Sequence, residues 1–247
     1  MKTSITILLL CLLLTPFWSL SQRAKELFEG KVSTDVLIND VDKIQSDLEE
    51  HHPNVYKFID KQSLNLKFDS LKKTIVLPIT RMEFRYKVLT VLQKVGDGHM
   101  TLIMNGSHVS LEDYQTYIGN TIRPMDQFQF KVIDMRLFIL SSLYNPGIKA
   151  GTEIVTVNGL PAWDVIAKIF GSICVDGYNN TFKYYSLNSG KFSNFYTNTF
   201  GNQNSVKFEL SGFGEKKAVE INNMSPTASP TAFPSIRLPP YPFSKDK

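Results

Sequence analysis

The residues best suited to chemistry lie in the short stretch Gly96-Asp97-Gly98-His99. Two glycines around an aspartate disfavour regular structure, so we expect a tight turn that fixes the direction of side chains. Asp97 and His99 are the polar groups that such a turn would place. The alternative is an ordinary Asp-Gly turn beside an incidentally exposed histidine.

A second candidate is the pair His51-His52, which precedes Pro53. Adjacent histidines do not share a helix face, so as metal ligands they would need partners that this segment lacks. A solvated helix end is the better interpretation, with cations near the negative end of the helix dipole. The sequence shows no metal-ligand cluster, phosphate-binding loop or dinucleotide fingerprint, and we therefore expect neither a metal nor a cofactor.

Helical periodicity before residue 96 indicates three helices that would position the turn. The first covers residues 35–50, with Thr34 as its expected N-cap. The third begins at the capping box Thr80–Glu83 and closes at Gly96. The apolar positions of the three faces are Leu37, Val41, Ile44 and Leu48; Leu64, Phe68 and Leu71; and Phe84, Val88, Leu92 and Val95.

The middle of the chain is typical of a small β-structure. Residues 128–142 alternate as a hairpin that turns at Asp134-Met135. Residues 147–159 then read as a single turn, a short strand and an Asn-Gly reversal, followed by a helix over 162–170. This order resembles the second half of a PDZ domain. An ordinary hairpin followed by a core helix is the alternative, and residues 205–221 predict one further hairpin.

The N-terminus resembles a secretory signal peptide. Lys2 precedes an apolar run, and small residues precede an expected cleavage after Ser21. The run is short for an uncleaved anchor, so we expect an exported protein, periplasmic or extracellular, with no stable membrane span after cleavage. Cleavage would leave Cys174 as a lone thiol, which we expect to be small and buried. The net charge of +4 is too small and dispersed to indicate nucleic-acid binding.

The expected fold is α+β. A helical bundle region leads into a PDZ-like small β-barrel with helices, then a β-hairpin and a disordered tail rich in proline. The corresponding ranges are 1–21 for the signal peptide, 22–118 for the helical domain, 119–175 for the PDZ-like domain, 176–224 for the start of a further core or cap, and 225–247 for the tail.

Taken in order, these motifs resemble the front portion of the tail-specific (C-terminal processing) serine peptidases, in particular the tricorn-like secreted bacterial branch. That family shows a His-Pro-Asn-hydrophobic-Tyr element, matched by residues 52–56, and a Thr-x-x-Glu-Phe helix start, matched by residues 80–84. It also shows an Asp-Gly-His-Thr element, where this chain has Asp97-Gly98-His99-Met100. The resemblance implies peptide-bond hydrolysis by a serine, with His99 as general base and Asp97 in a weaker, orienting role. The family's serine and oxyanion glycines follow the PDZ region, and no comparable strand-turn-helix elbow follows here. We therefore expect the chain to be inactive by itself.

A non-catalytic envelope module that binds peptides is the competing function. By analogy with PDZ domains, a peptide would add as a strand beside Phe128 and Phe130 and contact Val165 and Ile169 of the following helix. Under both hypotheses the partner is a peptide or an unfolded protein.

Overall fold

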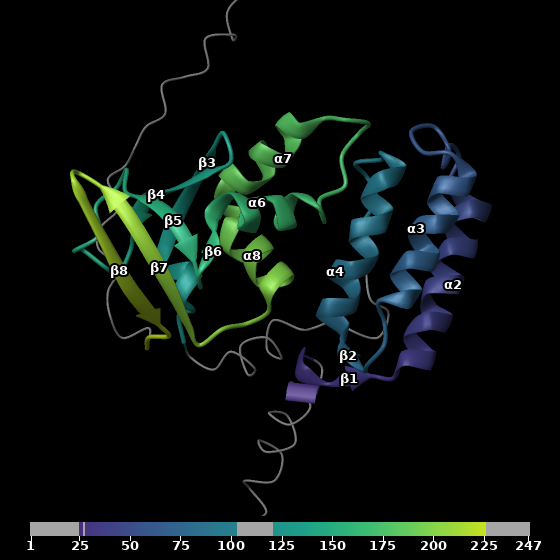
Figure 1. The fold of residues 1–247 in the computed structure, drawn as a ribbon, viewed down its shortest axis with the longest axis horizontal. Helices are drawn as coiled ribbons and strands as arrows, with labels where there is room; N and C mark the ends of the chain where they lie inside the picture. The colour runs from purple at the N-terminus through teal and green to yellow at the C-terminus, as the bar shows by residue number, and fades with distance from the viewer. Residues whose placement is uncertain (1–24, 27, 103–120, 226–247) are drawn as a thin grey trace, which may run out of the picture.

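The computed structural model describes residues 25–26, 28–102 and 121–225. The expected signal peptide and, apart from Ser225, the expected proline-rich tail lie outside these ranges. Within them, none of the helices combines the length and the hydropathy that a membrane span requires. The described chain is a mixed α and β structure, as predicted, with helices at one side and an antiparallel sheet at the other (Figure 1).

The N-terminal part is helical. It contains α2 (Thr34–His51), α3 (Lys61–Lys73) and α4 (Arg81–Leu92), which continues as the short 3₁₀ helix η1 (Gln93–Val95). Two short strands, β1 (Lys31–Val32) and β2 (Ile79–Thr80), pair antiparallel beside the start of α4. The apolar residues expected on the three helix faces pack into one cluster, most of them fully buried.

The predicted N-cap is confirmed for α4 and is wrong for α2. The Thr80 side chain accepts a hydrogen bond from the Glu83 amide at 3.2 Å, which confirms the N-cap of α4. Gly96 ends η1 with a left-handed φ of 73°, also as predicted. At α2 the N-cap is Ser33 rather than Thr34, which is already the first helical residue, and no side-chain cap bond forms.

The C-terminal part is built on a six-stranded sheet in the order β3-β4-β5-β7-β8, with β6 paired to β5. Both predicted hairpins, over residues 128–142 and 205–221, are confirmed, and so is the predicted helix over residues 162–170. Positive φ angles at Asp134, Met135, Asn158 and Gly159 produce the two expected reversals. The elements are η2 (Pro124–Gln127), β3 (Phe128–Ile133), β4 (Arg136–Ser142), β5 (Glu153–Val157), β6 (Leu160–Pro161), α6 (Ala162–Phe170), α7 (Asn180–Ser186), η3 (Leu187–Lys191), α8 (Phe192–Phe200), β7 (Ser205–Gly212) and β8 (Glu215–Asn222).

The sheet curves far enough to bring its two ends together. Ile122, just before β3, forms an isolated bridge with Met224, just after β8. Phe128 of β3 meets Phe208 of β7 with ring centroids 5.8 Å apart, although two strands separate β3 from β7 in the sheet order. Direct pairing between β3 and β8 does not occur among the described residues, so the sheet is half-open.

One predicted boundary is wrong. The predicted ranges divide the chain after residue 175 and make residues 176–224 the start of a further core or cap. In the structure β7 pairs directly with β5, and one apolar core extends from Met125 to Ile221. The second hairpin therefore belongs to the same sheet domain, and so do α7 and α8, because Leu187, Phe192 and Tyr196 lie in the shared core.

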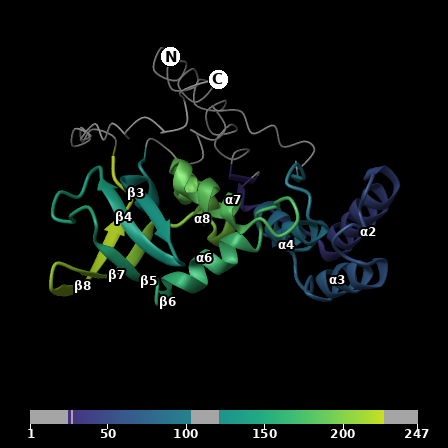
Figure 2. The ribbon, with the colours of Figure 1, turned by 90° about the horizontal axis from the view of Figure 1, so that it is seen from above.

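The two parts meet where α4 packs against α8, with α6 and α7 between the sheet and the helical side (Figure 2). Across this seam the Tyr86 hydroxyl donates to the Lys168 carbonyl, and the Lys183 ammonium donates to the Gln93 side chain. On its own side of the seam, the Lys183 ammonium also donates to the Phe170 carbonyl. Cys174 follows α6 but is buried in the helical cluster, and burial raises its pKa to about 11. The expectation of a buried thiol is confirmed.

At Val132, a side chain from η3 pairs with the free edge of β3. Asn188 of η3 accepts a hydrogen bond from the Val132 amide at 2.7 Å and donates one to the Val132 carbonyl at 3.0 Å. One carboxamide thus repeats the pair of bonds that a neighbouring strand would make.

Replacement of this carboxamide tests how much the pairing contributes. Asn188→Ala leaves the Val132 amide and carbonyl without these partners, and we expect the free energy of unfolding in urea to fall by about 1–2 kcal/mol. Asn202→Ala, at an exposed asparagine of the following loop, is the matched control and should change it little. Equal effects of the two substitutions would contradict the assigned role of Asn188.

Candidate functional site

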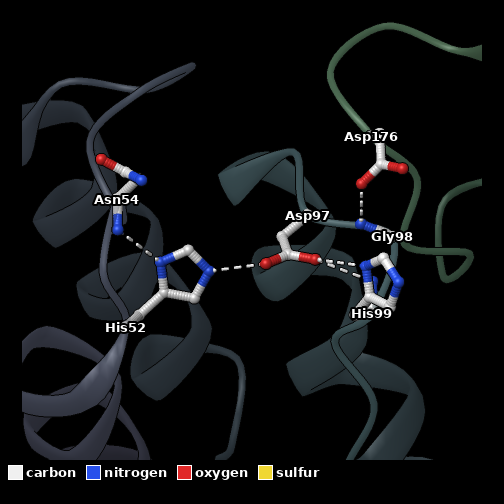
Figure 3. A network of polar contacts seen from close by, with 6 residues as sticks. All are labelled: His52, Asn54, Asp97, Gly98, His99 and Asp176. Carbon is white, nitrogen blue, oxygen red and sulfur yellow. Dashed lines mark hydrogen bonds and ion pairs between the residues drawn. The ribbon is translucent and has the colours of Figure 1, made fainter.

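A polar cavity of about 380 Å³ opens where three segments meet. Residues 52–58 enter it from the end of α2, residues 95–99 from the end of η1, and residues 176–177 from the loop before α7. The predicted residues Asp97 and His99 both line it. Figure 3 shows the polar contacts that connect the three segments.

The loop at residues 176–177, on the sheet-domain side of the seam, holds the turn at residues 96–98 by hydrogen bonds. The Gly177 amide donates to the Gly96 carbonyl at 2.9 Å, and the Gly98 amide donates to the Asp176 carboxylate at 2.8 Å. The ring of Phe58 lies against Gly96, where an added Cβ would come within 2.7 Å of it. A loop nearly eighty residues downstream therefore fixes the backbone from which Asp97 and His99 project.

Asp97 occupies the centre of the polar network. Its Oδ1 accepts the His99 amide at 2.7 Å and lies 3.5 Å from the His99 Nδ1. Its Oδ2 lies 3.0 Å from the Nε2 of His52. The His99 amide, and after it the His52 ring, lower the pKa of Asp97 against the opposing effect of partial burial. The carboxylate therefore contributes to stability at neutral pH, and this contribution is lost as the pH falls through its lowered folded-state pKa.

His99 is arranged as a base that faces solvent. Its side chain is 92% exposed, with Nδ1 on the side of Asp97 (Figure 3). A carboxylate on the Nδ1 side favours the proton on that nitrogen, and Nε2 is then the acceptor, which is the division of roles that a general base needs. The family resemblance implied only a weaker, orienting role for Asp97. In the structure the two side chains face each other.

The interpretation of His51-His52 as a solvated helix end holds for one histidine and is wrong for the other. His51 is exposed on the last turn of α2, and its Nδ1 donates to the Asp47 carbonyl. His52 leaves the helix with extended backbone angles before Pro53, and its side chain, only 12% exposed, turns into the cavity. The sequence could not show this contact, since its partner Asp97 lies 45 residues away.

Three side chains at this site could in principle ligate a metal. One ligand atom each from Asp97, His99 and Asp176 lies within 4.8 Å of the others. Each carboxylate also accepts a backbone amide hydrogen, Asp97 from His99 and Asp176 from Gly98. These bonds account for the directions of the two carboxylates, and we assign no metal to the three side chains.

The four residues predicted to contact a peptide are core residues. Phe128 and Phe130 are 4% exposed, and Val165 and Ile169 are 0% exposed, all within the sheet-domain core. They join the sheet to α6 and offer no surface to a ligand in this structure. The edge of β3 along which a peptide would add is also partly filled, at Val132, by Asn188.

The lining of the cavity offers few nucleophilic side chains. Among the described residues, its lining includes no serine, threonine or cysteine. Lys57 is present, but its ammonium lies over the Phe58 ring at 5.1 Å from the centroid. The described lining therefore combines an exposed imidazole beside a carboxylate with no hydroxyl or thiol side chain.

Comparison with known proteins gives a distant likeness. No family model matches the sequence, and no curated protein matches it. Among solved structures the chain is similar to mature CPAF, with 14% sequence identity and a TM-score of 0.47. The match covers 77% of this chain and 34% of the CPAF chain, so the chain spans about a third of that protein. The site is accordingly interpreted from its own geometry.

The backbone of the turn can be tested with two glycine substitutions. Gly96→Ala combines a left-handed φ with a close approach to Phe58, and we expect the free energy of unfolding to fall by about 2–4 kcal/mol. Gly159→Ala has a similar φ of 79° but nothing within 4 Å of the added methyl group, and should cost about 1 kcal/mol. Urea denaturation measures both. A Gly96→Ala protein no less stable than Gly159→Ala would show that Phe58 does not constrain the turn.

Proposed function

We propose that this chain supplies the general base of a serine-type peptidase related to the tail-specific family, acting on peptides or unfolded proteins. The observation that carries the proposal is the exposed His99 ring with its Nδ1 turned to the Asp97 carboxylate, at the rim of a polar cavity. The order of the motifs in the sequence supports the choice of family.

In the proposed reaction His99 acts at its Nε2. A serine hydroxyl gives its proton to Nε2 while its oxygen attacks the scissile carbonyl carbon, and Asp97 stabilises the imidazolium that forms. The same nitrogen then returns the proton to the leaving amine. The serine and the donors for the oxyanion are not among the described residues that line the cavity, so these residues alone should not hydrolyse amides.

Export is part of the proposal and rests on residues 1–21, which resemble a signal peptide. A periplasmic or extracellular location would bring the protein to peptides and unfolded chains. The alternative of a peptide-binding module at β3 is not carried forward, because its four contact residues are buried and Asn188 pairs with the strand edge.

The base can be tested separately from the missing nucleophile with p-nitrophenyl acetate, an activated ester that an imidazole can cleave without a serine. We expect His99→Gln and Asp97→Asn each to lower the rate of p-nitrophenolate release by at least about threefold. His51→Gln is the matched control, because His51 is exposed and bonds only to its own helix in the contacts described. Equal losses for His51→Gln and His99→Gln would show that His99 is not activated.

Peptide-bond hydrolysis gives the second test. The purified chain should leave unfolded casein intact and should not react with a fluorophosphonate probe. Serine-dependent hydrolysis by the pure chain would overturn the expectation that the chain is inactive by itself. Sequencing the DNA downstream in all three frames would show whether a glycine-rich turn with a serine is encoded there.

A further inference from the structure

We propose that His52 is a positioning residue, whose ring holds the Asp97 carboxylate so that Oδ1 faces His99. The inference deepens the proposed function and rests on it for its catalytic meaning. The contacts that carry it connect the end of α2 to the end of η1 through a single carboxylate (Figure 3).

The hydrogen bonds of His52 determine which ring nitrogen carries its proton. The Asn54 amide donates to Nδ1 at 3.2 Å, so Nδ1 must be an acceptor. The proton of the neutral ring is then on Nε2, which donates to Asp97 Oδ2 at 3.0 Å. Both nitrogens are engaged, and the ring is largely shielded from water. His52 therefore cannot take a proton from a substrate without breaking one of these bonds.

The Asp97 carboxylate needs this second anchor. About a third of its side chain is exposed, so water competes for both oxygens. The His99 amide holds Oδ1 but leaves the carboxylate plane free to rotate about the Cβ–Cγ bond, since one bond does not fix a plane. The donor from His52 on Oδ2 fixes that plane, and Oδ1 then stays on the side of the His99 Nδ1.

Pro53 and Asn54 explain why this position is suited to the role. Proline disfavours a helical conformation at the preceding residue, and His52 is accordingly extended, with φ −80° and ψ 122°. The chain then turns so that the Asn54 amide meets the ring of His52. The His-Pro-Asn sequence thus selects both the direction of the ring and its tautomer.

The test measures the ring tautomer of His99 by long-range ¹H–¹⁵N NMR spectroscopy of the full labelled chain, in buffer where the ring is neutral. In the unmodified protein we expect the Nδ1–H form of His99 to predominate. His52→Phe keeps a planar ring but removes the donor, and should lower the ratio of Nδ1–H to Nε2–H by roughly two- to five-fold, the size expected for loosening one exposed charged contact. His52→Gln restores an N–H donor and should recover the ratio.

His51→Phe is the matched control and should leave the tautomer of His99 unchanged. An unchanged ratio in His52→Phe, or an equal change in His51→Phe, would overturn the proposal.

The tautomer of His52 in the unmodified protein is a further readout that does not depend on any variant folding. Finding Nδ1–H there would also overturn the proposal, since no donor would then face Asp97. A failed ester assay with an intact tautomer response would instead count against the proposed function alone.

Discussion

The left-handed backbone of Gly96 is the constraint on which the rest of the site depends. It ends the helix that carries the core of the N-terminal part and turns the chain so that the Gly96 carbonyl and the Gly98 amide both face the loop at residues 176–177. The packed Phe58 ring leaves no room for a side chain there. The seam between the helical part and the sheet domain is thus also the scaffold of the cavity, and the two cannot be altered independently.

Beside that turn, the Asp97 carboxylate contacts two histidines, His52 and His99, whose surroundings differ. His52 is shielded and has both ring nitrogens bonded, whereas His99 is open to solvent and approaches Asp97 through Nδ1. The environment rather than the residue type separates the two roles, since both carry the same imidazole. Under the proposed function, these contacts would hold the base and its carboxylate in place before any reacting group arrives.

Much of this fold could be predicted from local patterns. Apolar periodicity predicted the helices and hairpins. The capping box at Thr80 predicted the start of α4, and Asn158-Gly159 predicted a chain reversal. Each of these features depends on residues close in sequence. The pairing of β5 with β7, the inward turn of His52 and the contact of Asp176 with Gly98 depend on residues between 45 and 78 positions apart. The apolar periodicity of a sequence carries no signal of such distant contacts. For this reason the boundary at residue 175 and the role of His52 were misassigned. Val165 and Ile169 show the same limit, since an apolar helix face is equally suited to a core and to a groove.

The Asn188 carboxamide, which pairs with Val132 of β3, also affects whether copies of this protein can associate. An edge strand with unpaired amides and carbonyls is a template on which a second chain can extend the sheet, and proteins commonly block such edges. Here the blocking group comes from the kinked segment at Leu187–Lys191, where Gly190 has a left-handed φ of 80°, so the protection depends on the local conformation of five residues. Loss of that kink would expose the edge while the rest of the sheet remained paired, and the expected consequence is self-association at high concentration rather than unfolding.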